Sequence, residues 1–169
     1  MTTEQTSAEK PAPAAEASDK VLKRFFETSE TARKASSSLK KAAEVGVRFT
    51  DVPGDFRFAV VDGKPSFTSG KAADPDFELT LAPGAVTAIA ANPNAEVGDL
   101  GITFFQQILS KDPAAKINVK LHSGVLKLTM RGWLGVVSQG GGKVMGWMAQ
   151  KGLRGPGAIA SAIGKLKKG

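Results

Sequence analysis

The sequence predicts an α+β protein in which helices cover one face of a β-sheet. Several short runs alternate apolar with polar residues, which is the pattern of a strand with one buried face. Between them lie stretches whose apolar residues recur at helical spacing. Strand and helix units do not alternate strictly, so a doubly wound parallel sheet is not expected. With 169 residues, 41% hydrophobic and 23% charged, the chain has the length and composition of one globular domain with a tail.

The chain divides into three parts. Residues 1–18 contain Thr, Glu, Ser, Ala and Pro without an apolar run, so we expect a disordered N-terminal tail and no secretory signal. Residues 19–152 form the folded domain. Residues 153–169 form a basic C-terminal tail, because the chain from residue 143 onward has six Lys or Arg and no acid. No run of about 18 apolar residues occurs, so we expect a soluble, cytoplasmic protein.

The first expected element is a helix over residues 21–43. Apolar residues recur there at three- and four-residue intervals, with charged residues between them. Ser18 or Asp19 is the candidate N-cap, and Gly46 is the candidate C-terminal end. Three consecutive serines at 36–38 can bend this helix or divide it in two.

Three strands and two helices are expected next. Residues 55–61 alternate, and the tight-turn signal Asp62-Gly63 joins them to a returning strand over residues 64–70. Residues 76–81 alternate again and form the third strand. Pro83 then suits the first turn of a helix that ends before residue 92, and a second helix is expected over residues 97–110.

Two further strands and a helical segment complete the domain. The strands are expected over residues 116–121 and 126–131, with Ser123-Gly124 turning between them. Helical spacing then returns, but three glycines at 140–142 interrupt it. Three Gly inside one helix would cost roughly 3 kcal/mol relative to Ala, so we expect a break or loop there that acts as a hinge.

The residue types exclude most catalytic centres. The absence of Cys excludes disulfides, thiolate nucleophiles and Cys-built metal sites, and a single His, His122, excludes His-pair sites. We interpret His122 as a solvent-exposed turn residue, because no acid lies near it in sequence; a proton shuttle is the functional alternative. Asp74 and Asp76 flank Pro75 without a partner, which favours turn capping. We therefore expect no metal, no cofactor and no enzymatic activity.

Four short segments carry a family resemblance: residues 45–49 (VGVRF), 60–63 (VVDG), 73–81 (ADPDFELTL) and 124–132 (GVLKLTMRG). In this order they resemble the sterol carrier protein type-2 family, and the similarity covers residues 21–151. Members of that family enclose an apolar tunnel that holds fatty acyl chains, sterols or other lipids. The resemblance implies a five-stranded, mostly antiparallel sheet, covered on one face by helices and enclosing such a tunnel.

The expected function is therefore binding of an apolar lipid, with lipid transfer as an extension of it. The alternative is an accessory or scaffold domain that docks on a partner enzyme through its apolar C-terminal segment. A lipid tail needs buried apolar area and few polar groups. The tunnel is expected between the apolar sheet face and the helices at residues 97–110 and 133–151, and the residues expected to line it are Phe104, Phe105, Ile108, Leu126, Leu128, Met130, Trp133, Val137, Met145 and Met148.

The basic tail is expected to contact anionic membranes. Ile159, Ile163 and Leu166 fall on one face of a short helix. The expected membrane contacts are the cations beside that face: Lys165, Lys167 and Lys168. A solubilising tail is the alternative. Nucleic acid is not expected as a partner, because no aromatic residue is interleaved with the basic ones after Lys151.

Overall fold

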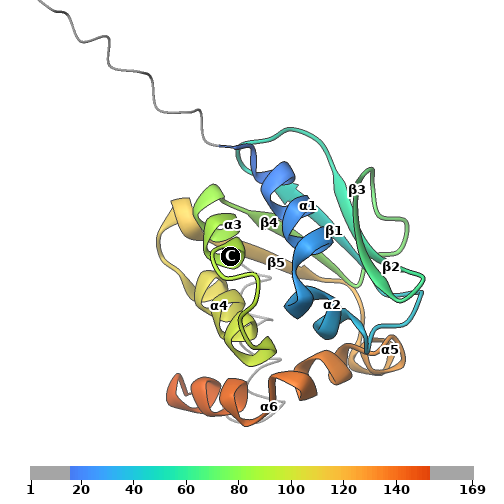
Figure 1. Ribbon diagram of the computed structural model, residues 1–169, viewed down its shortest axis with the longest axis vertical. Helices are drawn as coiled ribbons and strands as arrows, with labels where there is room; N and C mark the ends of the chain where they lie inside the picture. Colours follow the sequence, from blue (N-terminus) through green and yellow to red (C-terminus); the bar gives the residue numbers. More distant parts are fainter. Residues whose placement is uncertain (1–15, 153–169) are drawn as a thin grey trace, which may run out of the picture.

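The computed structural model describes residues 16–152 (Figure 1). Within this range the chain forms one five-stranded sheet and six α-helices, so the predicted α+β class is confirmed. Most of both predicted tails, residues 1–15 and 153–169, lies outside the described residues. The membrane contacts expected at Lys165, Lys167 and Lys168 lie outside them too.

The sheet has the strand order β3-β2-β1-β4-β5. Its neighbours are antiparallel except for β1 and β4, which are parallel. The sheet is therefore mostly antiparallel, as expected. The strands are β1 (Glu44–Phe49), β2 (Phe56–Val61), β3 (Lys64–Ser69), β4 (Phe77–Leu81) and β5 (Ile117–Leu121).

The earlier helices of the chain lie over one face of this sheet, and the last ones lie along one end of it (Figure 1). The helices are α1 (Ser18–Thr28), α2 (Glu30–Ser36), α3 (Pro83–Ala90), α4 (Val97–Leu109), α5 (Val125–Met130) and α6 (Trp133–Gln150), with a 3₁₀ turn, η1, over Pro113–Ala115. The predictions for α3 and α4 are confirmed, and Pro83 occupies the first turn of α3 because its fixed φ suits that position.

The N-terminal helix predicted over 21–43 differs from the structure. It divides in two at Ser29, earlier than the serine run, because the Ser29 hydroxyl accepts from the Ala32 amide (3.0 Å) and caps α2. The first helix begins one residue before the predicted caps: Ala17 is the N-cap, and the Ser18 hydroxyl donates to Asp51 at 2.8 Å. Gly46 does not end a helix but lies within β1.

The strand predicted over 126–131 is wrong, since residues 125–130 form helix α5. The Leu128 amide donates to the Gly124 carbonyl and the Arg131 amide to the Lys127 carbonyl, both at 3.0 Å. In the predicted strand, alternation put residues 126 and 130 on one face. Residues four apart also share one face of a helix, so the same pattern fits α5. The sheet nevertheless has five strands, because β1, which was not among the predicted strands, lies between β2 and β4.

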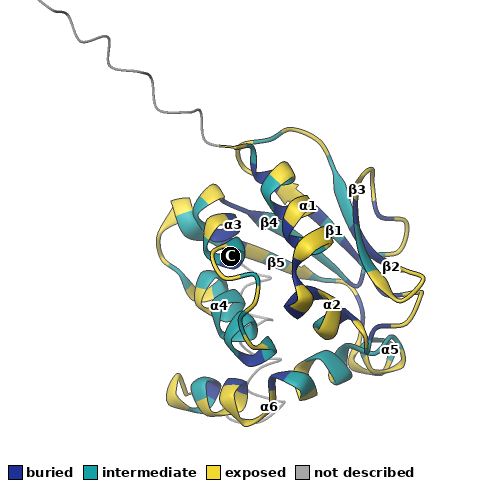
Figure 2. Ribbon diagram, viewed as in Figure 1, coloured by how far each residue is buried: buried dark blue, intermediate teal, exposed yellow. Residues whose placement is uncertain are grey.

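A cluster of aromatic core residues lies between α1 and the β1, β2 and β3 strands. Phe25 on α1 is 4% exposed, and neighbouring Phe26 lies with its ring centroid 4.9 Å from that of Phe58. Phe56 and Phe67 stack across the β2–β3 pair at 5.7 Å. Figure 2 shows buried positions in these elements, whereas α5 and α6 carry many exposed ones.

Candidate functional site

The inner face of the sheet is fully buried at one end of the β4–β5 pair and only partly buried at the other. Leu81 and Ile117 lie opposite each other and are 1% and 0% exposed. The next apolar pairs along the strands, Leu79 with Val119 and Phe77 with Leu121, are only partly buried. In parallel register with them, Val45 and Val47 of β1 are buried, so in this half of the sheet the incomplete cover lies on β4 and β5 and does not extend to β1.

Apolar side chains of two helices lie against this region. Leu100, Phe104 and Ile108 are spaced by four residues on α4, so they share one helix face; all three are partly buried and pack against the core. Trp133 at the start of α6 packs its ring edge to face with that of Phe77, with centroids 5.0 Å apart. We call the whole set the apolar zone: Phe77, Leu79, Val119, Leu100, Phe104, Ile108, Trp133 and Val136.

Three of the ten predicted lining residues belong to the apolar zone: Phe104, Ile108 and Trp133. Phe105 instead stacks on Trp147 of α6, with centroids 6.5 Å apart. Met148 on α6 is 2% exposed, and Leu128 on α5 is partly buried. The other four lie on the surface, with exposed fractions of 75% for Leu126, 70% for Met130, 46% for Val137 and 43% for Met145. The lining role of all ten stays a prediction.

Sequence reasoning missed the sheet side of the apolar zone. Phe77, Leu79 and Val119 were each placed on the apolar face of a predicted strand, but not among the lining residues. The signal for them was present, because the apolar face of a one-sided sheet must face whatever the helices enclose. The predicted lining residues instead included the Met and Trp residues of the C-terminal segment.

A buried carboxylate fixes the position of Trp133. Asp76 is 0% exposed, and its carboxylate accepts from three side chains: Trp133 Nε1 at 2.8 Å, Arg131 Nη1 at 2.7 Å and Ser123 Oγ at 2.6 Å. Asp74 also binds Arg131, at 2.5 Å. The interpretation of both acids as turn caps without a partner is therefore wrong. Their partners are 47 to 57 residues away in sequence, where spacing gives no signal.

The same carboxylate pair attaches α5 to the sheet. Lys127 Nζ lies 3.0 Å from Asp74 Oδ1, and Lys127 and Arg131 are one helical turn apart, so both can reach the acid from one helix face. Hydrogen bonds from Arg131 and Lys127 lower the pKa of Asp74 below its usual range. Asp76, with three donors and an Arg partner, is a satisfied structural group and positions the helices beside the apolar zone.

The outer face of the sheet is polar and slightly hollowed. A depression of about 460 Å³ is lined mainly by polar side chains of four strands, among them Arg48, Glu78, Asn118 and Lys120. His122, at the end of β5, places Nε2 2.9 Å from Glu78 Oε2 on β4. His122 is exposed, as interpreted from the sequence, but strand pairing gives it an acid partner 44 residues away in sequence. This hydrogen bond lowers the pKa of Glu78.

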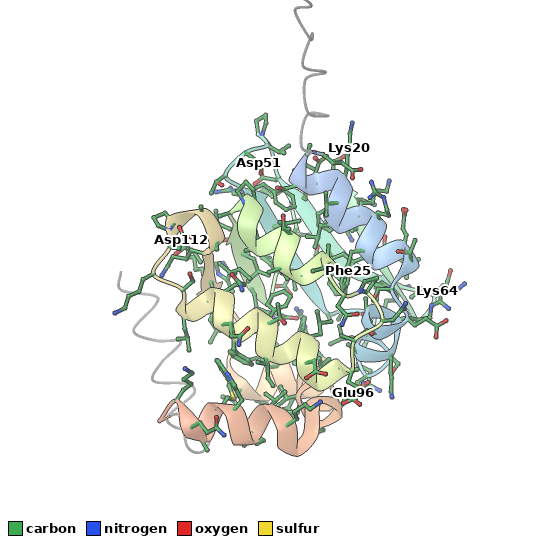
Figure 3. All side chains as sticks on the ribbon, turned by 60° about the vertical axis from the view of Figure 1, so that its left-hand side comes forward. Lys20, Phe25, Asp51, Lys64, Glu96 and Asp112 are labelled. Atoms are coloured by element: carbon green, nitrogen blue, oxygen red, sulfur yellow. The ribbon has the colours of Figure 1, made fainter. Side chains whose placement is uncertain are left out.

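Helix α6 is kinked within its glycine run, which confirms the predicted break. Gly141 has φ 60° and ψ −153°, a conformation open essentially only to glycine. Just before the kink, α6 closely approaches the start of α4, since a Cβ on Gly98 would lie 2.9 Å from the Gly140 carbonyl oxygen. Glu96, labelled in Figure 3, precedes α4 and accepts a 3.0 Å hydrogen bond from Lys143 of α6. The hinge role of the run stays a prediction.

A second depression, of about 570 Å³, lies between α2, the start of α4 and this kink. Its polar lining includes Thr31, Asn94, Glu96, Gln139 and Lys143. Neither depression is a closed apolar tunnel, and the tunnel implied by the resemblance is not shown. Among residues 16–152 no group of three or more His, Asp or Glu side chains is placed to hold a metal ion. No helix in that range has the length and hydrophobicity to cross a bilayer.

No family model matches the chain, and no curated protein matches it either. A search of solved structures finds a chain described as "UbiJ-SCP2 Ubiquinone synthesis protein", with a TM-score of 0.40 and 11% sequence identity. The match covers 72% of this chain and 86% of that one. Similarity at this level does not assign the chain to a family.

Proposed function

We propose that this protein binds a lipid, without catalysing a reaction on it, and that the apolar tail of the lipid lies in the apolar zone between β4, β5, α4 and α6. The observation that carries the proposal is the uneven cover of the inner sheet face. Its residues are fully buried at Leu81 and Ile117 but only partly buried from Leu79 and Val119 onward. A well-packed core leaves few such side chains incompletely covered.

The chemistry of the apolar zone suits a hydrocarbon chain. Its side chains are aromatic and aliphatic, and the one polar group among them, the Trp133 indole N–H, is already bonded to Asp76. Burial of apolar surface contributes about 25 cal/mol per Å², so an acyl chain is stabilised there without specific polar contacts. The kink at Gly141 lies in α6, the helix that carries Trp133 and Val136. Movement of that helix would change access to the zone.

Titration with a fluorescent polyene fatty acid tests the proposal. We expect a dissociation constant in the micromolar range or below, which corresponds to about −8 kcal/mol. Phe104→Ala removes a ring from the apolar zone and should weaken binding. Phe105→Ala is the matched control, because that ring stacks on Trp147 outside the zone. The proposal fails if saturating ligand changes neither the fluorescence nor the melting temperature.

Transfer of the bound lipid between membranes is a finer proposal. It is tested by following a labelled fatty acid from donor to acceptor vesicles, with transfer faster than spontaneous exchange as the expected result. Binding without accelerated transfer would leave a storage or presentation role. A cytoplasmic location likewise stays a prediction.

A further inference from the structure

Helix α5 and the first half of α6 carry a concentration of exposed apolar side chains. Among residues 16–152, five of the eight large exposed apolar side chains lie between positions 125 and 137. We call them the outer strip: Val125 (72% exposed), Leu126 (75%), Met130 (70%), Leu134 (51%) and Val137 (46%). On a soluble monomer, large side chains of this kind rarely gather in one place, so such a patch marks an interaction site.

The outer strip lies beside the apolar zone. Trp133 and Val136 of α6 pack against the core, whereas their neighbours Leu134 and Val137 are exposed. The first half of α6 is therefore apolar on two sides. One side faces the sheet, and the other has no cover among the described residues.

Charge in this part of the chain has one sign. From residue 113 to the end of the chain there is no Asp or Glu, and the basic residues are Lys116, Lys120, Lys127, Arg131, Lys143, Lys151, Arg154, Lys165, Lys167 and Lys168. In the folded protein Lys127 and Arg131 pair with Asp74, and Arg131 also pairs with buried Asp76, so these two acids offset the charge of two of the cations. Lys40 is an exposed cation nearby. Its backbone amide donates to the Arg131 carbonyl at 2.9 Å, which places it next to the end of α5.

We infer that the outer strip docks on an anionic membrane surface, with its apolar side chains among the lipid head groups and the flanking cations against the phosphates. Helices with an apolar face and basic flanks lie in the membrane interface in this way. Charge complementarity selects this occupant over two others. A second copy would bring the same cations together, and residues 153–169 contain four more basic residues and no acid to neutralise them.

Vesicle sedimentation with the full-length protein tests the inference. The probes are vesicles of phosphatidylcholine alone and of phosphatidylcholine with about a third phosphatidylglycerol. The wild type should bind the anionic vesicles at low salt and bind the neutral vesicles much less, because neutral vesicles lack the surface charge that attracts the basic residues. Added salt should weaken binding to the anionic vesicles, because it screens this attraction. No lipid ligand is added, so failure here would not be failure of the proposed function.

A pair of double variants locates the contact. Leu126→Asp with Met130→Asp should reduce binding to anionic vesicles by about tenfold or more, since it places charge in the outer strip. Thr68→Asp with Thr87→Asp makes the same change in net charge at exposed positions on β3 and α3 and is the matched control. Melting temperatures of both variants confirm that they are folded. Equal binding by the two double variants would overturn the inference.

Single-cysteine labelling gives a direct measure, because the natural chain contains no Cys. An environment-sensitive fluorophore on Met130→Cys should shift to the blue when anionic vesicles are added, whereas the same label on Thr87→Cys should not. Three results would overturn the inference: no binding of the wild type to anionic vesicles, a label at position 130 that responds only to protein concentration, and loss of binding confined to Lys165→Gln, Lys167→Gln and Lys168→Gln. The second result indicates an interface between copies, and the third a contact through the tail.

Discussion

Trp133 donates from its indole nitrogen to the buried carboxylate of Asp76 at 2.8 Å, and its ring packs at right angles on Phe77, the residue that follows Asp76. Asp76 and Phe77 thus hold the Trp133 indole by its N–H and by its ring, and fix the start of α6 against β4. Asp76 is in turn held by the backbone, since its amide donates to the Glu44 carbonyl at 2.7 Å. The start of α6 has a defined place on the sheet, whereas its second half follows a kink.

Removal of the Asp76 carboxylate should strongly destabilise the fold. In Asp76→Ala, Arg131 keeps Asp74, but the Trp133 and Ser123 donors lose their buried acceptor, and each buried donor left unpaired costs about 1–3 kcal/mol. Trp133→Phe keeps the ion pair and removes one charge-assisted hydrogen bond, so it should cost about 1.5–3 kcal/mol. Urea unfolding of both variants measures the difference. A loss below 1 kcal/mol for Asp76→Ala would contradict the structural role assigned to it.

The kink in α6 should depend on Gly141 and not on its neighbour. Gly141→Ala places a Cβ at φ 60° and ψ −153°, which costs about 1–3 kcal/mol if the kink is kept. Gly142→Ala is the control, since it has no positive φ and a Cβ there would meet nothing within 4 Å; in a helix the change should be neutral or slightly stabilising. Thermal unfolding compares the two. Hydrogen exchange at residues 140–142, slower with bound fatty acid than without, would support the hinge.

A larger side chain in the apolar zone should compete with ligand. Ile108→Trp is expected to lower fatty-acid affinity by about tenfold, because the indole occupies apolar space that the ligand uses. Leu126→Trp adds the same side chain on the outer strip, where Leu126 is 75% exposed, and should leave affinity unchanged. Fluorescent fatty-acid titration gives both values. If Ile108→Trp unfolds the protein while Phe104→Ala binds ligand normally, the zone is filled by the protein itself.

Stability should fall at acidic pH partly through Glu78. The hydrogen bond with His122 lowers the pKa of this carboxyl in the folded protein, so in the acid range the unfolded chain binds more protons at this site. Its contribution is present above the ordinary pKa of about 4.3 and is lost as the pH falls through the lower folded value. Since the Glu78 side chain is 39% exposed, the effect is expected to be below about 1 kcal/mol.

Urea unfolding at pH 6 and pH 3 checks this expectation. The wild type should lose more stability between these two pH values than Glu78→Gln does, because the amide does not titrate. Glu27→Gln, on the exposed side of α1, is the control and should behave like the wild type. An equal loss in Glu78→Gln and the wild type would mean that the contact with His122 does not stabilise the fold.

Local sequence patterns determined much of this protein. Alternation over residues 55–61 and 76–81 located β2 and β4, because side chains on a strand point to opposite faces with a period of two, and the Asp62-Gly63 turn signal located β3. Apolar spacing located α4 to within a residue, and the glycine run located the break in α6. Each of these features depends on neighbours in sequence, so the sequence carries the signal directly.

Tertiary structure decided what depends on residues that are distant in sequence. The segment Leu126–Met130 has a pattern that fits a strand or a helix, and Asp74, reached by Lys127 and Arg131 from 53 and 57 residues away, binds the helical form. His122 gained an acid partner only because β5 pairs with β4. The partly covered end of the inner sheet face likewise follows from where α4 and α6 pack. A local pattern fixes which face of an element is apolar, but the partner of that face is set by contacts that form only when the chain folds.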